Sequence, residues 1–274
     1  MRKSVVMGSF DDLRSSDVRF LEEAARRGEL HAFLWSDEVV RRLDGRDPKF
    51  SLGERMYLLQ AIRHVHQVHL VDQLTERECL PPYGELSGGA WVVDEGSDTP
   101  QKRAFCASYG MNYQVVKHDV LRRFPSQPAR ALLDAAPDQK KVLVTGCFDW
   151  FHSGHVRFFE EVAELGQLHV VVGSDQNVRL LKGYGHPMFP QEERRYVVQS
   201  VRFVERALIS SGSGWLDAEP EIVRIKPDVY AVNEDGDQPE KRIYCEEHGI
   251  QYVVLKRTPK EGLPKRQSVD LRGF

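Results

Sequence analysis

Short apolar runs alternate with amphipathic segments along most of the 274-residue chain. In the second half, 142–144 and 168–173 are mostly apolar runs with the length and β-branched content of buried strands. Between them, Val156, Phe159 and Val162 fall on one face of a helix. Because strands that alternate with helices favour right-handed βαβ units, the pattern predicts an α/β fold with a parallel sheet covered by helices.

The same alternation extends through both halves. Helices are predicted over 18–27, over 238–248 and over 191–204, where four valines at 197, 198, 201 and 204 face inward. Ser51 is expected to be the N-cap of another helix, with Glu54 completing a capping box. The other segments predicted as strands, the first of which runs into a turn, are 4–11, 30–35, 65–71, 90–94, 113–117, 207–210, 227–233 and 251–255.

The two halves share sequence anchors at an offset of 138 or 139 residues. The motif Gly-x-Phe-Asp occurs at 8–11 and at 146–149, and a Glu-Arg pair at 54–55 returns at 193–194. Several anchors that hold one offset indicate an internal repeat. We therefore expect two tandem Rossmann-like (HUP-type) domains, each with a doubly wound parallel sheet.

Pro-rich, polar stretches in the middle of the chain mark a boundary between the two copies. The predicted organisation is a degenerate domain over 1–121, a linker over 122–139 and a catalytic domain over 140–274. We also expect the two copies to pack as a pseudo-dimer within one chain, and we allow for a homodimer of that chain.

The candidate chemistry lies where the strand 142–144 runs into a turn and a helix. The first amides of a helix lack intrahelical acceptors and the helix dipole favours negative charge there, so such a junction binds anions. His152 and His155 stand at this helix start, three residues apart, so both rings can face one side. Imidazoles donate hydrogen bonds to phosphate oxygens, and Gly154 between them is expected to let a ligand approach the backbone.

The first copy lacks both histidines. Arg14 and Asp17 occupy the corresponding positions, and an aspartate that faces a triphosphate would repel it. The interpretation we favour is a catalytically inactive copy retained for packing. The alternative is a regulatory nucleotide or substrate site built around Arg14.

Residues 146–155, Gly-Cys-Phe-Asp-Trp-Phe-His-Ser-Gly-His, resemble the signature of the HxGH nucleotidylyltransferases. Within them the chain is most similar to the cytidylyltransferases that activate phosphocholine, phosphoethanolamine or glycerol 3-phosphate. The Lys-Gly pair at 182–183, the Glu-Glu-Arg run at 192–194, and Arg-Thr at 257–258 followed by Ser268 extend the resemblance. It implies attack of a substrate phosphate on the nucleotide α-phosphate, with pyrophosphate leaving.

The resemblance also implies roles for individual residues. Catalytic roles are expected for His152, His155 and Lys182. Nucleotide binding is expected for Gly146, Cys147, Phe148, Arg194, Asn233, Arg257, Thr258 and Ser268. Substrate contacts are expected for Asp149, Asp175 and Trp215.

Three of these assignments have a structural alternative. Asp175 can instead cap the following helix, and Arg194 can form a solvated pair with Glu193. Trp215 can hold a quaternary ammonium group by cation–π attraction, or be a buried residue that packs its loop. Mg²⁺ is expected as a cofactor that bridges the triphosphate, with no metal ligands from side chains.

The predicted activity is transfer of CMP from CTP to a phosphorylated alcohol. An adenylyltransferase that uses ATP on a phosphorylated sugar or alcohol is the first alternative. A non-catalytic nucleotide-sensing or scaffold protein is the second, and the intact histidines of the second copy count against it.

Composition limits the classes of binding partner, the kinds of site and the cellular location that remain. The net charge of -3 gives no electrostatic case for nucleic-acid binding. The four cysteines are far apart and show no C-x-x-C spacing, which argues against a zinc site or a disulfide framework and favours the cytoplasm. The N-terminal apolar run is too short for a signal peptide, and no run approaches the ~18 apolar residues of a membrane span.

Overall fold

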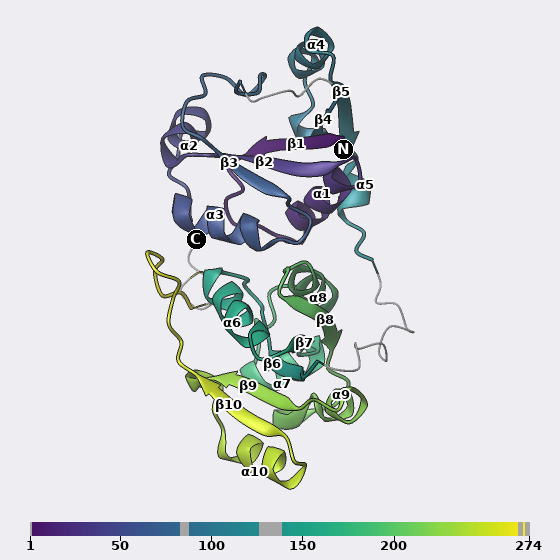
Figure 1. The fold of residues 1–274 in the computed structure, drawn as a ribbon, viewed down its shortest axis with the longest axis vertical. Coiled ribbons are helices and arrows are strands. Elements are labelled where there is room, and N and C mark those ends of the chain that lie inside the picture. Colours follow the sequence, from purple (N-terminus) through teal and green to yellow (C-terminus); the bar gives the residue numbers. More distant parts are fainter. Residues whose placement is uncertain (1, 83–87, 126–138, 268–270, 272–274) are drawn as a thin grey trace. The chain divides into compact units, whose positions relative to one another are not determined.

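The computed structural model describes all of the chain except residues 1, 83–87, 126–138, 268–270 and 272–274. The chain divides into two compact units, Met1–Phe124 and Pro125–Phe274 (Figure 1). This division falls within the predicted linker 122–139, most of which lies outside the described residues. Each unit is considered by itself below.

The first unit contains a five-stranded parallel sheet in the order β3-β2-β1-β4-β5. Its strands are β1 Lys3–Gly8, β2 Glu29–Trp35, β3 Gln67–Val71, β4 Ala90–Asp94 and β5 Asn112–Val116. Its helices are α1 Ser15–Ala25, α2 Asp37–Asp44, α3 Leu52–Ala61, the 3-10 helix η1 Glu95–Ser97, α4 Pro100–Ser108 and α5 His118–Leu121. Helices α1 and α3 lie on one side of the sheet and α4 on the other (Figure 1).

The second unit repeats this topology, with a parallel sheet in the order β10-β9-β6-β7-β8. Its strands are β6 Lys141–Gly146, β7 Gln167–Val172, β8 Val204–Ile209, β9 Val229–Asn233 and β10 Gln251–Leu255. Its helices are α6 Ser153–Ala163, α7 Asp175–Lys182, α8 Gln191–Gln199, η2 Gly214–Leu216, α9 Glu219–Ile225, η3 Glu234–Gly236 and α10 Pro239–Glu247. The predicted α/β fold with two Rossmann-like parallel sheets is confirmed.

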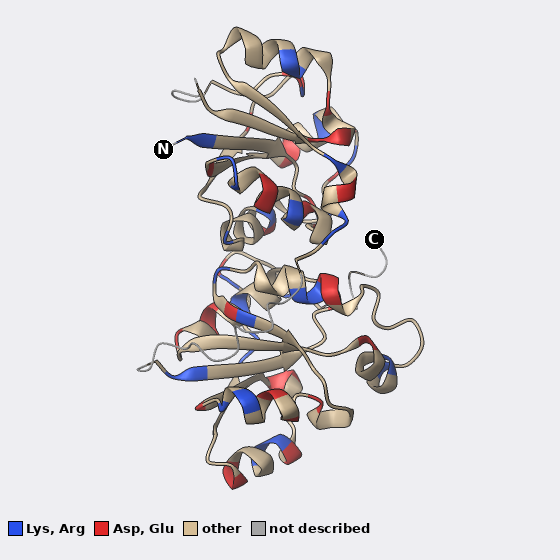
Figure 2. Ribbon diagram, turned by 90° about the vertical axis from the view of Figure 1, so that its right-hand side faces the viewer, with Lys and Arg blue, Asp and Glu red and all other residues tan. Residues whose placement is uncertain are grey.

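Burial explains why the apolar runs form the central strands. Val142, Leu143 and Val144 of β6 have no exposed surface, and neither has Val5 or Val6 of β1. Both faces of these strands are covered, which is why they are continuously apolar rather than alternating. Acidic and basic residues are interspersed on the helices of both units (Figure 2).

Two predictions of local structure need correction, and one is confirmed. The helix predicted over 191–204 ends at Gln199, and Val204 begins β8, although all four valines are buried as expected. Helix α2 was not predicted, because this short segment has only three apolar residues, the buried Val39 and Val40 and the partly buried Leu43. The capping box of Ser51 and Glu54 is present in α3.

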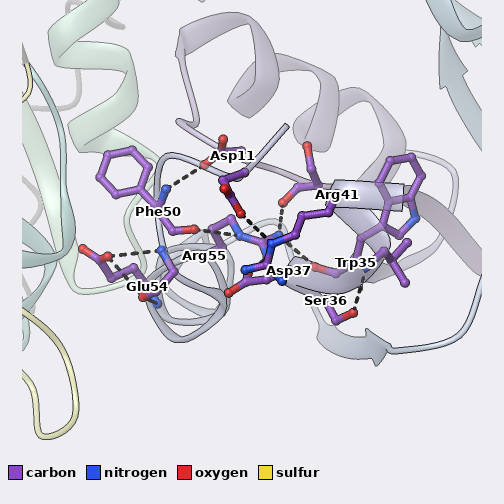
Figure 3. Close-up of polar contacts among 12 residues, drawn as sticks. Asp11, Trp35, Ser36, Asp37, Arg41, Phe50, Glu54 and Arg55 are labelled. Atoms are coloured by element: carbon purple, nitrogen blue, oxygen red, sulfur yellow. Dashed lines mark hydrogen bonds and ion pairs between the residues drawn. The ribbon is translucent and has the colours of Figure 1, made fainter. Parts of the chain in front are cut away.

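A buried arginine joins three segments in each unit, and the two arrangements match. Arg55 in α3 donates to the carbonyl oxygens of Ser9, Trp35 and Phe50, at 2.6, 2.8 and 3.1 Å, and to Asp37 at 2.5 Å (Figure 3). Arg194 in α8 does the same in the second unit. Its acceptors are the carbonyl oxygens of Cys147, Gly173 and Phe189 at 2.6, 2.8 and 2.9 Å and Asp175 at 2.7 Å.

The internal repeat is thus visible in bonds as well as in sequence. Asp11 accepts the amides of Lys49 and Phe50, and Asp149 accepts those of Met188 and Phe189. In each unit the arginine and the aspartate together fix the turn after the first strand against the loop before the arginine's helix.

We predict that Arg194→Met lowers the free energy of unfolding of the second unit by roughly 3–5 kcal/mol, because it leaves a carboxylate and three carbonyl groups without their donor. Arg55→Met is expected to do the same in the first unit. Urea unfolding followed by circular dichroism measures both. Arg242→Met is the control, since its ion pair with Asp237 is half exposed and is expected to contribute less than about 1 kcal/mol. Losses below that value for both buried arginines would contradict the assignment.

Candidate active site

The second unit has a cleft of about 320 Å³ at the carboxyl ends of β6 and β9. These neighbouring strands lie where the strand order reverses, which is where open α/β sheets bind ligands. Residues that line the cleft are Thr145, Gly146, Cys147, Phe148, Asp149, His155, Phe158, Lys182, Val232, Asn233, Asp235, Gly236, Lys241, Arg257 and Gln267.

The cleft brings together eight of the residues predicted from the sequence. They come from the turn after β6, the start of α6, the end of α7, the end of β9 and the segment after β10: Gly146, Cys147, Phe148, Asp149, His155, Lys182, Asn233 and Arg257. His152, Asp175, Arg194, Thr258 and Trp215 do not line it. Ser268 lies outside the described residues.

The two histidines are stacked one against the other, as their spacing suggested. Their ring centroids are 4.0 Å apart at an interplanar angle of 24°. His152 is the N-cap of α6 and is fully buried, and its Nδ1 accepts the amide of Gly154 at 3.1 Å. His155 lies in the cleft wall. The expectation that both rings face the ligand is therefore wrong for His152, whose ring lies behind the wall and supports that of His155.

A hydrogen bond defines which ring nitrogen of His155 carries the proton. The Nδ1 atom of His155 accepts the amide of His152 at 3.4 Å, so the proton of the neutral ring is on Nε2. Burial, together with the nearby His152, Arg257 and Lys182, lowers the pKa of His155 well below its usual value. At neutral pH this ring is an uncharged donor.

Gly154 has a packing role beside the one expected. A Cβ atom there would lie 3.0 Å from the His152 ring, so the packing of that ring also favours glycine; whether a ligand approaches here stays a prediction. Gly146 is constrained in the same way, since a Cβ would come within 2.7 Å of the Phe148 ring. Phe148 itself has φ of 51°, a strained left-handed conformation at the turn. The signature turn is built by side chains packed over glycines.

Three cationic side chains face the cleft. Lys182 is exposed at the end of α7, next to Gly183. Arg257 is paired with Asp235 and also donates to the Arg266 carbonyl at 3.0 Å. Lys241, in α10, has its pKa lowered by burial, which disfavours the charged form. Together they make a wall suited to a polyanion.

Several predicted ligand contacts are structural instead. Arg194 is buried and bonded to backbone oxygens and to Asp175, so neither its solvated pair with Glu193 nor a contact with the cleft is present. Ser174, not Asp175, is the N-cap of α7. Asp149 lines the cleft, but its Oδ1 accepts two backbone amides.

Trp215 is half exposed and lies outside the cleft lining, so the expectation of a buried tryptophan is wrong. Thr258 lines a small depression beside the cleft, together with Arg257 and Gly154. The polar cleft residues that sequence reasoning missed are Thr145, Asp235, Lys241 and Gln267. Only Lys241 carried a signal, because the Lys-Arg pair at 241–242 repeats the pair at 102–103.

A family model described as Cytidylyltransferase-like matches residues 5–142 and 143–265. The chain belongs to this family. The two matched segments agree with the internal repeat, and the membership identifies the chain as a nucleotidyltransferase of this family.

Curated relatives cover less than half of the chain each. The chain is similar to FAD synthase of Ferroglobus placidus, with 38% identity over 44% of this chain and 78% of the relative. The FAD synthase of Methanopyrus kandleri is 33% identical over 48% of this chain and 89% of the relative. The Bifunctional protein HldE of Campylobacter concisus is 32% identical over 47% of this chain and 26% of the relative. None of the helices in the described part of this cytidylyltransferase-like chain has the length and apolar character needed to cross a membrane.

We predict that His155 makes the stability of the cytidylyltransferase-like chain fall on acidification. Its pKa is lower in the folded than in the unfolded state, so the unfolded chain binds the proton first as the pH drops below about 6.5. Stability is therefore fully present above that pH and is lost below it. Denaturant unfolding between pH 7 and 5 is expected to show His155→Asn losing about 1 kcal/mol less per pH unit than the unchanged chain. Parallel pH profiles for the two proteins would contradict a neutral, buried ring.

Proposed function

We propose that the second unit transfers AMP from ATP to the phosphate group of a phosphorylated alcohol and releases pyrophosphate. The observation that carries this proposal is a neutral histidine at the start of α6 that shares one cleft with Lys182, Lys241 and Arg257. A neutral Nε2–H donor and three cations suit the inner phosphates of a nucleoside triphosphate. No nucleophilic side chain of the chain is required, because a phosphate oxygen of the acceptor is itself the nucleophile.

In the reaction, an oxygen of the acceptor phosphate attacks the α-phosphorus of the nucleotide. The bond between that phosphorus and the oxygen bridging to the β-phosphorus breaks, and pyrophosphate leaves with the electron pair. His155 donates from Nε2 to a phosphate oxygen that gains charge in the transition state. Lys182 and Arg257 reduce the charge of the triphosphate.

In this proposal Mg²⁺ binds together with the triphosphate. The carboxylates of the cleft are already engaged, since Asp149 accepts two amides and Asp235 pairs with Arg257. The donor set therefore fits an ion whose ligands are mainly phosphate oxygens and water, which is how Mg²⁺ usually binds with nucleotides. When bound, it would offset the charge of the phosphates.

The choice of ATP is supported by the relatives that are named FAD synthase. The product named, FAD, consists of AMP and riboflavin 5′-phosphate. The phosphates of these two parts together form a pyrophosphate linkage. CTP is the alternative, and the Arg-Thr pair at 257–258, which resembles that of cytidylyltransferases, favours it. A phosphorylated alcohol as acceptor is common to both.

The first unit is not proposed to catalyse this reaction. Arg14 pairs with Asp12 at 2.6 Å and Lys49 pairs with the same carboxylate at 2.9 Å. Asp17, at the position of His155, accepts the Arg14 amide at 2.8 Å. The region that would receive phosphates thus contains carboxyl groups, which disfavour a triphosphate.

We predict that His155→Ala lowers kcat by at least about 10²-fold, because the ring acts on charge that develops in the transition state. Release of pyrophosphate measures the rate. Arg14→Ala is the matched control at the first-unit counterpart of His152, and its rate is expected to equal that of the unchanged chain. An undiminished rate for His155→Ala would rule out the proposed role.

We further predict that kcat/KM with ATP exceeds that with CTP by at least about tenfold, since a site that hydrogen-bonds one base discriminates against the other. Acceptors for the assay are riboflavin 5′-phosphate, glycerol 3-phosphate, phosphocholine and phosphoethanolamine. A preference for CTP would contradict the choice of ATP and support the cytidylyltransferase alternative. Turnover of neither nucleotide with any acceptor would refute both.

A further inference from the structure

The first unit retains a cavity of about 260 Å³ at the same corner of its sheet, although Arg14 and Asp17 stand there in place of the two histidines. It lies at the carboxyl ends of β1 and β4, the counterparts of β6 and β9. Met7, Asp94 and Lys102 line it, at the positions that Thr145, Asn233 and Lys241 occupy in the cleft of the second unit. We propose that this cavity is a binding site for an uncharged nucleoside, separate from the site of nucleotidyl transfer.

The local geometry of the corner is the same in both units. Lys102 is buried, its Nζ donates to the carbonyl of Ser97 at 2.7 Å, and it lies 5.9 Å from the ring centroid of Trp91. Lys241 donates to the carbonyl of Gly236 at 3.3 Å and lies 5.9 Å from the ring of Tyr230. The first unit has therefore kept the local arrangement of this corner of the sheet.

Aromatic residues make this cavity suitable for a flat heterocycle. Trp35 stands where the second unit has Gly173, and Trp91 where it has Tyr230. Both indoles line the cavity, with the Arg77 guanidinium 5.7 Å from the ring centroid of Trp35. Trp35 is 6 % and Trp91 1 % exposed, so the two indoles give the cavity a rigid aromatic wall against which a flat heterocycle can pack.

Charge decides against a phosphorylated ligand. The two cations in the lining, Arg77 and Lys102, are balanced by Glu78 and Asp94. In the region where phosphates would extend, Asp17 stands in place of His155. Arg14, which stands in place of His152, and Lys49 are both paired with Asp12, so a phosphate there would meet both carboxyl groups. A nucleoside without phosphates avoids this repulsion, and a triphosphate does not.

Polar groups are available for the sugar and the base. Asp94 accepts from the amide and hydroxyl of Ser97 at 3.0 and 2.9 Å, one bond on each oxygen, which leaves acceptor capacity for ribose hydroxyls. A carboxylate near the strand end is a common partner of ribose in such folds. The volume is near the lower limit of roughly 300 Å³ for ligand pockets, which suits a nucleoside better than a dinucleotide.

The test uses the full chain with Trp150→Phe and Trp215→Phe, so that only Trp35 and Trp91 of the four tryptophans emit. Adenosine and cytidine are titrated at constant protein, and quenching or a shift of the emission measures binding to the first unit. We expect saturable binding of at least one nucleoside, weakened about tenfold or more by Lys102→Met. Lys241→Met, the same change in the second unit, is the matched control and is expected to leave this binding unchanged.

Circular dichroism establishes that each variant is folded. If Lys102→Met does not fold, Arg77→Gln replaces it, because that side chain is half exposed and its loss is expected to weaken binding several-fold. Failure of both nucleosides to bind at millimolar concentration would overturn the proposal. So would tighter binding of Mg·ATP than of adenosine, or equal losses in the Lys102 and Lys241 variants. The inference does not depend on the activity proposed for the second unit.

Discussion

The architecture of each unit depends on a buried guanidinium that bridges the carboxyl ends of two neighbouring parallel strands. Such strand ends expose carbonyl groups that have no partner in the sheet, and a turn must leave the sheet there without burying them unpaired. Arg194 supplies donors to two of these carbonyls, those of Cys147 and Gly173, and also to the Phe189 carbonyl and Asp175. The same residue anchors the loop that precedes α8, so the position of the signature turn and the edge of the cleft follow from one side chain. A planar donor with five N–H groups is needed for this, which lysine cannot replace.

Much of the fold could be read from the sequence because its signals are local. The order of strands and helices, the two copies and the start of α3 follow from apolar runs, repeated anchors and a capping box. The histidine pair was also recognisable, since spacing alone places two rings on one side of a helix start. These features depend on residues a few positions apart, for which periodicity is a sufficient guide.

The parts that could not be predicted depend on contacts between distant segments. Arg194, Asp149 and Asp175 are residue types that suggest ligand binding, and only three-dimensional packing reveals that their bonds are made to the protein itself. Lys241 follows Lys182 by 59 residues in the sequence (241 − 182), so only the folded chain brings the two cations into one cleft. For the same reason the packing of the His152 ring against Gly154 was missed, because spacing alone does not give the position of that ring.

The pair of side chains at the start of α1 and α6 also bears on how the chain came to have two unequal copies. In both helices the third residue accepts the amide of the N-cap, His155 from His152 and Asp17 from Arg14. A carboxylate accepts this amide hydrogen bond as well as an imidazole does. After a gene duplication, mutation at these positions can therefore erase chemistry from one copy while its helix still begins correctly. Further mutations can then adapt this copy to another ligand while each intermediate sequence still folds.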